Sequence, residues 1–539
     1  MNKNTGGTKM KHVRTLRTIA ALLTLVLLLS ACGGAAEPIG TSAPQSTTAP
    51  AGTEAATSSE PVKLTYFAYS LGDSVVQSYN ENVMYQEMEK ILNIDLEFQH
   101  ASNGSYAEQL SVRVASGDLP DMVESFSYAK GPQAAIDDGI ILRLNDLVEQ
   151  YAPDFLALLE SNPDIKREVV LDDGTIWCIP CLQPKPEPAW RGISIRGDLL
   201  EQANLEKPET IAEFKAMLQT FKGMGITYPL SLGFGYNDGP FQGDGYFVAA
   251  YGIGPSWYKD LENGEVQFGP MQDAYLDFLT EMHSWYAEGL IDPDFATRQN
   301  NEMDAYIVNG EVGAFVSGYG PSKNYQTNCQ AQNPDIYLVQ VANPSLTKGV
   351  PAQMRNQDSV NKGNYTVITA NCENPEAAMT FLNFGFTEEG AMMYNYGLEG
   401  VSYTMVDGKP EFTDAMTDGS EGAWPQIREK YKKNTGPYNR DWEAAPLGDY
   451  EYQCMDSWSQ AGTDLKLPAH ISMTAEESSR FNTIMNDVFT YLNENVPAFI
   501  NGARSLDEFD TFRADLEGLG INEALEIQRT AYARYKNRA

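Results

Sequence analysis

The chain has 539 residues, 42% of them hydrophobic, which is enough for two or three domains with substantial cores. It carries 38 Lys and Arg against 73 Asp and Glu, and the formal net charge of −35 argues against a protein that binds nucleic acid through a basic face. With 29 Tyr, 22 Phe and 7 Trp the chain is too aromatic for a disordered acidic polymer, and its 4 His leave little material for histidine-based catalysis.

The N-terminal residues have the pattern of a secretion signal. The stretch 3–17 is basic with no acidic residue, and the apolar run Ile19–Leu29 is too short to span a bilayer comfortably. The run ends in Leu29-Ser-Ala-Cys-Gly33, which resembles the lipobox of bacterial lipoproteins. That resemblance implies a signal peptide at 1–31 and a lipid, palmitate included, on Cys32 as the new N-terminus. The alternative is an ordinary signal peptide with a chance cysteine.

A tether follows the cysteine. Residues 33–60 consist mostly of Gly, Ala, Ser, Thr and Pro, with Ile39 as the only large apolar side chain. Such a segment buries too little surface to offset its chain entropy, so 32–61 is predicted to be the lipidated cysteine and a flexible tether. We therefore expect a protein that is lipid-anchored to the cell membrane on its extracellular face.

Strand and helix patterns alternate from residue 62 onward. Apolar and polar residues alternate over 62–69, and apolar residues recur at helical spacing over 80–92. A second strand is predicted at 94–98, a helix at 106–115 and a third strand at 121–125. This order indicates an α/β fold with an open sheet whose ligands gather at the strand ends. Further helices are predicted at 144–151, 210–222, 271–288, 375–384 and 478–495, and a further strand at 312–316.

Five cysteines follow Cys32, an odd number that leaves at least one unpaired or paired between chains. Cys178-Ile-Pro-Cys181 has the spacing of a redox motif, but it follows Gly174-Thr-Ile-Trp in an apparent strand and does not open a helix. We therefore expect buried structural thiols or a local disulfide here, rather than a redox or metal site.

An ordered set of short motifs resembles the family 1 extracellular solute-binding proteins, the lipoprotein subunits of ABC importers, in the long group linked to oligosaccharides. Each motif alone is weak, but together they run in order over the whole body from residue 62. The motifs are Ser116-Gly-Asp-Leu-Pro-Asp-Met122, Leu144-Asn-Asp-Leu147 with Tyr151-Ala-Pro153, Asp173-Gly-Thr-Ile176, Ile195-Arg-Gly-Asp198, Pro208-Glu-Thr-Ile-Ala-Glu-Phe214, Glu288-Gly-Leu-Ile-Asp-Pro-Asp-Phe295, Gly310-Glu-Val-Gly-Ala-Phe315, Asn395-Tyr-Gly-Leu-Glu-Gly-Val401 and Ala531-Tyr-Ala-Arg-Tyr535.

The resemblance implies a two-lobed periplasmic-binding-protein-like fold of type II, with the ligand cleft at the hinge between the lobes. By similarity the first lobe holds 62–186 plus 345–390, and the second holds 187–344 plus 391–539. The proline-rich segment 179–188 stands where the first connection between the lobes is expected. The protein would be a monomer that captures an oligosaccharide by hinge closure and delivers it to the membrane subunits of an ABC transporter.

One departure from the family concerns calcium. Many relatives carry an acidic calcium loop after the helix that matches 210–222, but the corresponding stretch 221–229 has no carboxylate. Calcium takes six to eight oxygen ligands, several of them carboxylates. No calcium site, no other metal and no cofactor is therefore predicted.

Two other functions compete with a transport receptor. A secreted carbohydrate-active enzyme would also be acidic and aromatic-rich, and would need two catalytic carboxylates. Asp292-Pro-Asp294 is more simply a turn after a helix, and the HExxH, G-x-S-x-G and P-loop patterns are absent from the sequence. A peptide-binding or sensor lipoprotein would share the anchor and the fold. The whole-length resemblance favours the receptor, and no catalytic residue is assigned.

Candidate ligand-binding residues come from predicted strand ends, from the segment after the first connection, and from tryptophans in irregular segments. For each one, core packing or surface exposure is as plausible as ligand contact. They are Tyr69, Ser70, Ser127, Tyr128, Trp190, Arg191, Tyr236, Trp257, Tyr319, Arg355, Trp442 and Trp458.

Overall fold

The computed structural model describes residues 60–538, except Ser70, Asp73, Asn103, 184–186, 233–243, Gln299 and 434–446. The predicted signal peptide, Cys32 and nearly all of the tether lie outside the described residues. The described residues belong to one compact unit that begins at Glu60. Within the described ranges, no helix combines the length and the apolar character needed to cross a membrane.

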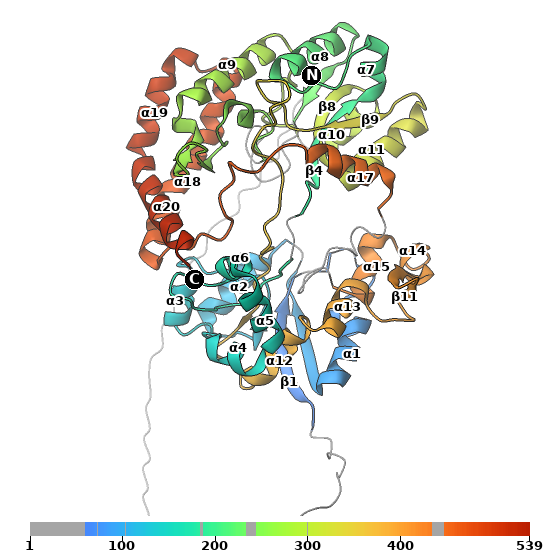
Figure 1. Ribbon diagram of the computed structural model, residues 1–539, viewed down its shortest axis with the longest axis vertical. Coiled ribbons are helices and arrows are strands. Elements are labelled where there is room, and N and C mark those ends of the chain that lie inside the picture. Colours follow the sequence, from blue (N-terminus) through green and yellow to red (C-terminus); the bar gives the residue numbers. More distant parts are fainter. Residues whose placement is uncertain are drawn as a thin grey trace, which may run out of the picture. The chain divides into compact units, whose positions relative to one another are not determined.

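The first lobe is built around a four-stranded sheet of order β10-β3-β1-β2 (Figure 1). Strand β1 pairs in parallel with β2, with Val62 opposite Ile94, and also in parallel with β3. The alternation predicted at 62–69 has a physical basis, because Leu64 and Tyr66 enter one core cluster while Phe67 enters the cluster on the other face. The strands are β1 (Val62–Ala68), β2 (Ile94–His100), β3 (Met122–Val123) and the antiparallel β10 (Val367–Ile368).

Helices cover both faces of this sheet. Helix α1 (Val83–Leu92) begins where the Asn82 side chain accepts a hydrogen bond from the backbone N–H of Tyr85, and it ends at Asn93 in the left-handed conformation. The remaining helices of the lobe are α2 (Tyr106–Ser116), α3 (Pro132–Asp137), α4 (Asn145–Tyr151), α5 (Pro153–Ser161), α6 (Pro163–Val169), α12 (Pro375–Phe384), α13 (Glu388–Tyr396), α14 (Asp414–Thr417) and α15 (Trp424–Tyr431), with the hairpin β11 (Tyr403–Val406) and β12 (Lys409–Phe412).

The second lobe contains a separate four-stranded sheet of order β5-β8-β4-β9. Strand β4 is antiparallel to both of its neighbours, and β5 is parallel to β8. The strands are β4 (Arg191–Arg196), β5 (Tyr228–Ser231), β8 (Val312–Gly318) and β9 (Leu338–Val341), and a small hairpin joins β6 (Trp257–Lys259) to β7 (Val266–Phe268). The helices are α7 (Gly197–Ala203), α8 (Ile211–Gly223), α9 (Asp273–Ala287), α10 (Asn300–Val308), α11 (Tyr319–Gln332), α17 (Asp449–Trp458), α18 (Ala475–Asn501), α19 (Phe509–Gly518) and α20 (Ile521–Lys536).

Most predicted elements are confirmed, with shifted ends. The helix predicted at 478–495 is the longer α18, because Thr474 and Glu477 form a capping box that starts it earlier, and Gly502 ends it in the left-handed conformation. The strand predicted at 121–125 is only Met122–Val123, since Ser125 has a φ of 48° and turns the chain. The apparent strand at 178–181 forms no regular ladder, but Ile179 makes an isolated bridge to Thr366.

The contacts favour lobe boundaries other than those expected from the resemblance. Met393 and Tyr394 of α13 belong to the core cluster of the first sheet, and Val83 of α1 packs on the cluster around Ile427 of α15. Ala352 and Met354 belong instead to the core cluster of the second lobe. We therefore propose that 391–433 belongs to the first lobe and 345–357 to the second, whereas the sequence-based division placed both the other way.

Candidate functional site

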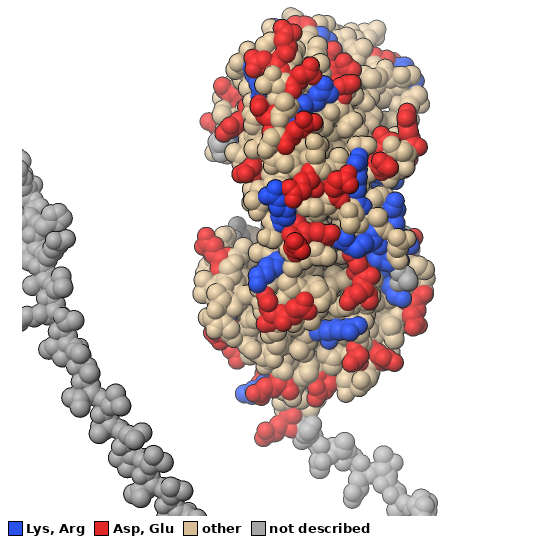
Figure 2. All heavy atoms as spheres, turned by 90° about the vertical axis from the view of Figure 1, so that its left-hand side faces the viewer, with Lys and Arg blue, Asp and Glu red and all other residues tan. Residues whose placement is uncertain are grey.

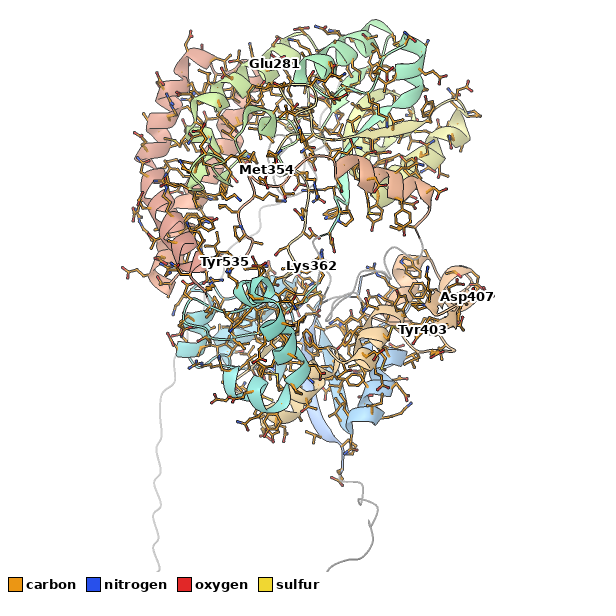
Figure 3. The ribbon with its side chains drawn as sticks, in the orientation of Figure 1. Glu281, Met354, Lys362, Tyr403, Asp407 and Tyr535 are labelled. Atoms are coloured by element: carbon orange, nitrogen blue, oxygen red, sulfur yellow. The ribbon has the colours of Figure 1, made fainter. Side chains whose placement is uncertain are left out.

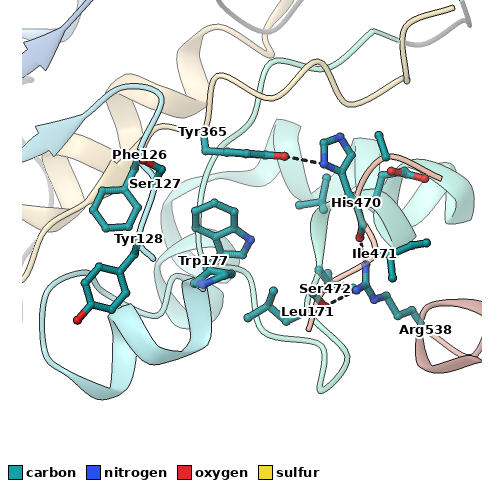
Figure 4. Close-up of a pocket in the computed structure, with 15 residues that line it drawn as sticks. Phe126, Ser127, Tyr128, Leu171, Trp177, Tyr365, His470, Ile471, Ser472 and Arg538 are labelled. Carbon is teal, nitrogen blue, oxygen red and sulfur yellow. Dashed lines mark hydrogen bonds between the residues drawn. The ribbon is translucent and has the colours of Figure 1, made fainter. Parts of the chain in front are cut away.

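A cavity of about 290 Å³ is lined by residues from both lobes (Figure 4). The first lobe contributes the loop after β3, the end of α6 with the turn that follows, Trp177 and Tyr365; the second lobe contributes the segment before α18 and the chain end after α20. The lining residues are Phe126, Ser127, Tyr128, Pro132, Glu168, Val169, Val170, Leu171, Trp177, Tyr365, Ala469, His470, Ile471, Ser472 and Arg538.

The loop after β3 reaches the cavity because the chain turns sharply at its base. Ser125 adopts a positive φ of 48°, and the backbone N–H of Phe126 then donates to the carbonyl of Tyr365 at 3.0 Å. Phe126 is buried, whereas Ser127 is exposed and Tyr128 is half-buried with its hydroxyl donating to Asp138 at 2.7 Å. This loop sits at the carboxyl end of a parallel strand, where ligands of open α/β sheets bind.

An aromatic wall forms the first-lobe side of the cavity. The rings of Trp177 and Tyr365 have centroids 4.8 Å apart at an angle of 47°, and both are half-buried. They pack on a core cluster that includes Val123, Cys178 and Val367. These cluster partners all belong to the first lobe, so the apolar packing beneath the wall comes from that lobe.

His470 connects this wall to the second lobe. Its Nδ1 lies 2.6 Å from the Tyr365 hydroxyl (Figure 4), and its Nε2 lies 2.8 Å from the carbonyl oxygen of Asn361. Burial lowers the pKa of His470, so the neutral ring is favoured. A carbonyl can only accept, so we assign the proton to Nε2, and Nδ1 accepts from Tyr365.

The charged groups around the cavity differ in whether their hydrogen-bonding atoms have partners. Arg538 donates from Nε to Asp172 Oδ1 at 2.8 Å, and its side chain is 1% exposed. Glu168 accepts a hydrogen bond from the Tyr535 hydroxyl at Oε1, but its buried Oε2 has no hydrogen-bond partner among the described residues. A buried acceptor without a donor costs about 1–3 kcal/mol.

Two connections between the lobes run side by side in opposite directions. The backbone N–H of Cys181 donates to Gly363 at 2.9 Å, and that of Gln183 donates to Val360 at 2.7 Å. Lys362, labelled in Figure 3, lies on the second connection and pairs with Glu187 of the first at 3.1 Å. The two connections therefore form a single paired hinge.

Trp190 and Arg191 directly follow the first connection, and their side chains make hydrogen bonds there. The Trp190 Nε1 donates to Asp358 at 3.2 Å, and the Arg191 guanidinium lies 5.2 Å from the Trp190 ring centroid. Arg191 Nε also donates to Asp244 at 2.7 Å. Trp190 thus contacts the second connection through Asp358 and Arg191 contacts Asp244, and neither predicted residue lines the cavity of Figure 4.

A buried ion pair holds the end of α15 in the first lobe. Lys433 lies 2.8 Å from Glu124, and both side chains are 3% exposed. The Lys433 ammonium also lies over the rings of Tyr66 and Tyr79, at 5.5 and 5.1 Å from their centroids. Glu124 directly follows β3, so the pair fixes the chain beside the carboxyl end of the sheet.

The other predicted site residues are scattered. Tyr69 is 48% exposed and its ring stacks on Tyr106 at 4.2 Å, at the end of β1. Arg355 donates to the carbonyl of Ala461 at 2.9 Å, in the second lobe. Tyr319 begins α11 and is half-buried against the cluster around Cys454. Ser70, Tyr236 and Trp442 lie outside the described residues.

Two of the predicted tryptophans pack against other parts of the protein. Trp458 is 2% exposed and its Nε1 donates to the carbonyl of Ile193 at 2.9 Å, so its ring packs on β4. Trp257 packs between Phe268 and Phe481, with ring centroids at 4.6 and 5.7 Å. Neither lines the cavity of Figure 4, so these surroundings give no support to ligand contact.

Of the predicted residues that the structure describes, only Ser127 and Tyr128 line the cavity, and the aromatic wall was missed. Trp177 directly follows the Asp173-Gly-Thr-Ile176 motif, which is a usable signal because the motif ends just before the first connection. Tyr365 and His470 stand in irregular segments whose position relative to the sheet the sequence pattern does not fix. Arg538 lies in the final residues of the chain, where no local pattern points to a site.

The cysteines that the structure describes form no disulfide. Cys178, Cys181, Cys329 and Cys454 are buried, and Cys372 is half-buried. Burial raises the pKa of the Cys178 thiol well above its usual range, which is the opposite of what a redox cysteine needs. The expectation of buried structural thiols is therefore confirmed. Within the described ranges, no group of three or more His, Cys, Asp or Glu residues is placed to hold a metal ion.

Two α/β lobes, a paired hinge and a cavity lined from both sides define a type II periplasmic solute-binding fold. The chain belongs to the bacterial extracellular solute-binding protein family, whose model matches residues 72–392. The resemblance read from the motifs is thereby confirmed.

Individual relatives agree with this assignment. The chain is 22% identical over 503 residues to the fructooligosaccharide ABC transporter substrate-binding protein FusA of Streptococcus pneumoniae serotype 4, covering 85% of this chain and 88% of that one. The crystal structure of the alginate-binding protein AlgQ2 without calcium ion has a TM-score of 0.67 at 25% identity, covering 88% of this chain and 98% of that one. An HMO-binding ABC-transporter-associated solute-binding protein from Bifidobacterium longum infantis has a TM-score of 0.73 at 16% identity, covering 88% and 99%.

Proposed function

We propose that the protein is the membrane-anchored substrate-binding subunit of an ABC importer and that it captures a neutral oligosaccharide in the cavity between its lobes. The supporting observation is the aromatic wall of Trp177 and Tyr365, which faces hydrogen-bonding groups from both lobes. Flat rings suit the C–H faces of sugars, and a few fixed polar groups suit the hydroxyls. The similarity to FusA, which is named as a fructooligosaccharide-binding subunit, supports the same ligand class.

The charges around the cavity favour a neutral sugar over an acidic one. Arg538 is occupied by Asp172, whereas the Oε2 atom of Glu168 has no donor among the described residues. The carboxylate of an acidic sugar in the cavity would be repelled by Glu168, whereas a neutral sugar would not. This differs from what the name of AlgQ2 says of that protein, which binds alginate.

A panel of ligands tests the proposal. The mature protein is mixed with neutral oligosaccharides of different lengths and linkages, with oligouronates, and with di- to pentapeptides, and its melting temperature is measured for each. We expect stabilisation by one or more neutral oligosaccharides and a smaller effect of oligouronates. Stabilisation by peptides alone would refute the sugar assignment and favour a peptide-binding lipoprotein.

The same samples separate a receptor from an enzyme. A binding protein leaves the bound oligosaccharide intact, so mass spectrometry after long incubation should recover it uncut. Release of shorter sugars in step with protein concentration would instead support a carbohydrate-active enzyme, and the carboxylates near the cavity would become candidates for catalysis.

The proposed anchor is tested separately at Cys32. Because the thiol is the point of lipid attachment, Cys32→Ala should leave the protein unprocessed or release it from the membrane fraction. Cell fractionation and intact mass measure this, with Cys372→Ala as a control that keeps the lipobox. An unchanged membrane fraction and mass for the Cys32 variant would remove the lipoprotein assignment.

A further inference from the structure

The end of α20 crosses from the second lobe to the first. Arg538 Nε donates to Asp172 Oδ1 at 2.8 Å, and Arg534 Nε donates to Asp172 Oδ2 at 2.5 Å. Asp172 lies in the turn after α6, so both oxygens of one first-lobe carboxylate are occupied by two second-lobe guanidinium groups. Figure 2, which faces the side of α20, shows basic and acidic side chains interleaved between the two lobes.

The two arginines are held in place by their own lobe. Arg538 Nη1 donates to the carbonyl of His470 at 2.8 Å, and its Nη2 donates to the Ser472 hydroxyl. Arg534 Nη1 donates to Glu477 at 2.9 Å, at the start of α18. Because these partners belong to the second lobe, the arginines keep their positions when the lobes separate, and only the bonds to the first lobe are lost.

Further first-lobe groups accept from the same chain end. The Arg538 Nη1 donates to the carbonyl of Arg167 at 3.0 Å, and the Tyr535 hydroxyl donates to Glu168 (Figure 3). Ser472 donates to Asp172 at 3.2 Å. Charge-assisted hydrogen bonds of this kind are about twice as strong as neutral ones, and Arg538 is almost fully buried, so solvent screens its bonds weakly.

These contacts stand at the wall of the cavity. Arg538 and Ser472 line it from the second lobe, and Glu168 and Leu171, which directly precedes Asp172, line it from the first. Because these bonds join the two lobes beside the cavity, separation of the lobes at this point would break them.

We propose that Asp172, Arg534 and Arg538 form a latch that closes the two lobes over the ligand cavity. Asp172 and Arg534, which do not line the cavity, then act as positioning residues for binding: their pairing raises the fraction of molecules in the closed, binding-competent state. Apparent affinity falls in proportion to that fraction, so loss of the Asp172 carboxylate weakens binding without removing a residue that lines the cavity. The identity of the ligand in this inference rests on the proposed function, but the closure of the lobes does not.

The test is Asp172→Asn in the full mature chain, which keeps the size of the side chain and removes its charge. Small-angle X-ray scattering without ligand should show a larger radius of gyration for the variant than for the wild type. With the oligosaccharide that stabilises the wild type, the dissociation constant should rise about tenfold, mainly through faster dissociation. Asp164→Asn is the matched control, because Asp164 is exposed on α6 and pairs only with its neighbour Arg167 among the described residues.

The outcomes are separable. Equal scattering and an equal dissociation rate for Asp172→Asn and wild type would overturn the latch, as would tighter binding by the variant. If Asp172→Asn unfolds, Arg534→Gln serves instead, since Arg534 is partly exposed and its loss leaves Arg538 in place. If no oligosaccharide binds the wild type, the proposed function fails, but the scattering comparison still decides the latch.

Discussion

The two sides of the cavity are built on different principles. On the first-lobe side, Trp177 and Tyr365 rest on a core cluster of their own lobe, so their geometry is set before any ligand arrives. On the second-lobe side, Arg538 and Ser472 gain their first-lobe partners only when the lobes meet. The comparison indicates that different residues serve recognition and closure. Apolar packing fixes the shape of the surface that contacts the sugar, and the paired charges form only when the cleft is closed.

The largest effect should come from the buried pair that holds α15 beside β3. Lys433→Met leaves Glu124 charged and buried without its ammonium partner, which should cost about 3–5 kcal/mol of unfolding free energy. Urea unfolding measures the loss as a lower midpoint. Lys430→Met is the control, because its pair with Glu421 is partly exposed and such pairs contribute about 0–1 kcal/mol. Equal midpoints for the two variants would show that the first lobe does not depend on this pair.

The preformed wall is tested by Trp177→Ala. Removing the ring takes away the largest apolar surface offered to a sugar, so binding should weaken by about 1–3 kcal/mol. Isothermal titration calorimetry measures the loss, and Phe489→Ala on α18, an exposed ring outside the cavity, should leave affinity unchanged. Unlike the latch variant, Trp177→Ala should leave the scattering profile without ligand as it is. Full affinity in this variant would place the recognition surface elsewhere.

The contact between wall and second lobe should depend on pH. Burial lowers the pKa of His470 in the folded protein, so the unfolded chain takes up a proton near pH 6.5 while the folded chain does not. Stability therefore falls as the pH drops below about 6.5, by at most about 1.4 kcal/mol per unit for one group. His470→Gln should flatten part of that decline in thermal melts between pH 7 and pH 5. Part remains, since burial also lowers the pKa of His100.

His283→Gln is the control for that series, because His283 lies on α9 against the carbonyl of Ile500 and outside the cavity. An identical pH dependence for wild type and His470→Gln would show that the Tyr365–His470 bond does not sense pH.

The smallest expected effect is that of chelation. The loop 221–229 has no carboxylate, and calcium requires several oxygen ligands, so EDTA should not change the stabilisation given by a bound oligosaccharide. Melting curves with EDTA, and then with added calcium, measure this. Loss of stabilisation with EDTA that calcium restores would contradict it and would show that ligand binding depends on a metal ion.

The sequence-based predictions were accurate where a structural feature depends on residues that are close together in the chain. Strand β1 and helix α1 follow from alternation and capping within a few neighbouring residues, and both were predicted. Ser127 and Tyr128 were predicted because α/β topology places ligand sites at strand ends, and both line the cavity. Trp257 was chosen for its irregular, glycine-rich surroundings, but residues distant in the chain, such as Phe481, cover its ring.

By itself the sequence determined the family, the α/β class and the strand-end loop of the site, because each depends on patterns within short segments. The tertiary structure decided which aromatic rings face the cavity and which charges are paired. Trp177 meets Tyr365 from nearly two hundred residues away in the chain, and Arg538 meets Asp172 across a separation of 366 residues. Contacts between residues so far apart in the chain depend on how the two lobes fold and pack, and the local periodicity of the sequence does not predict them.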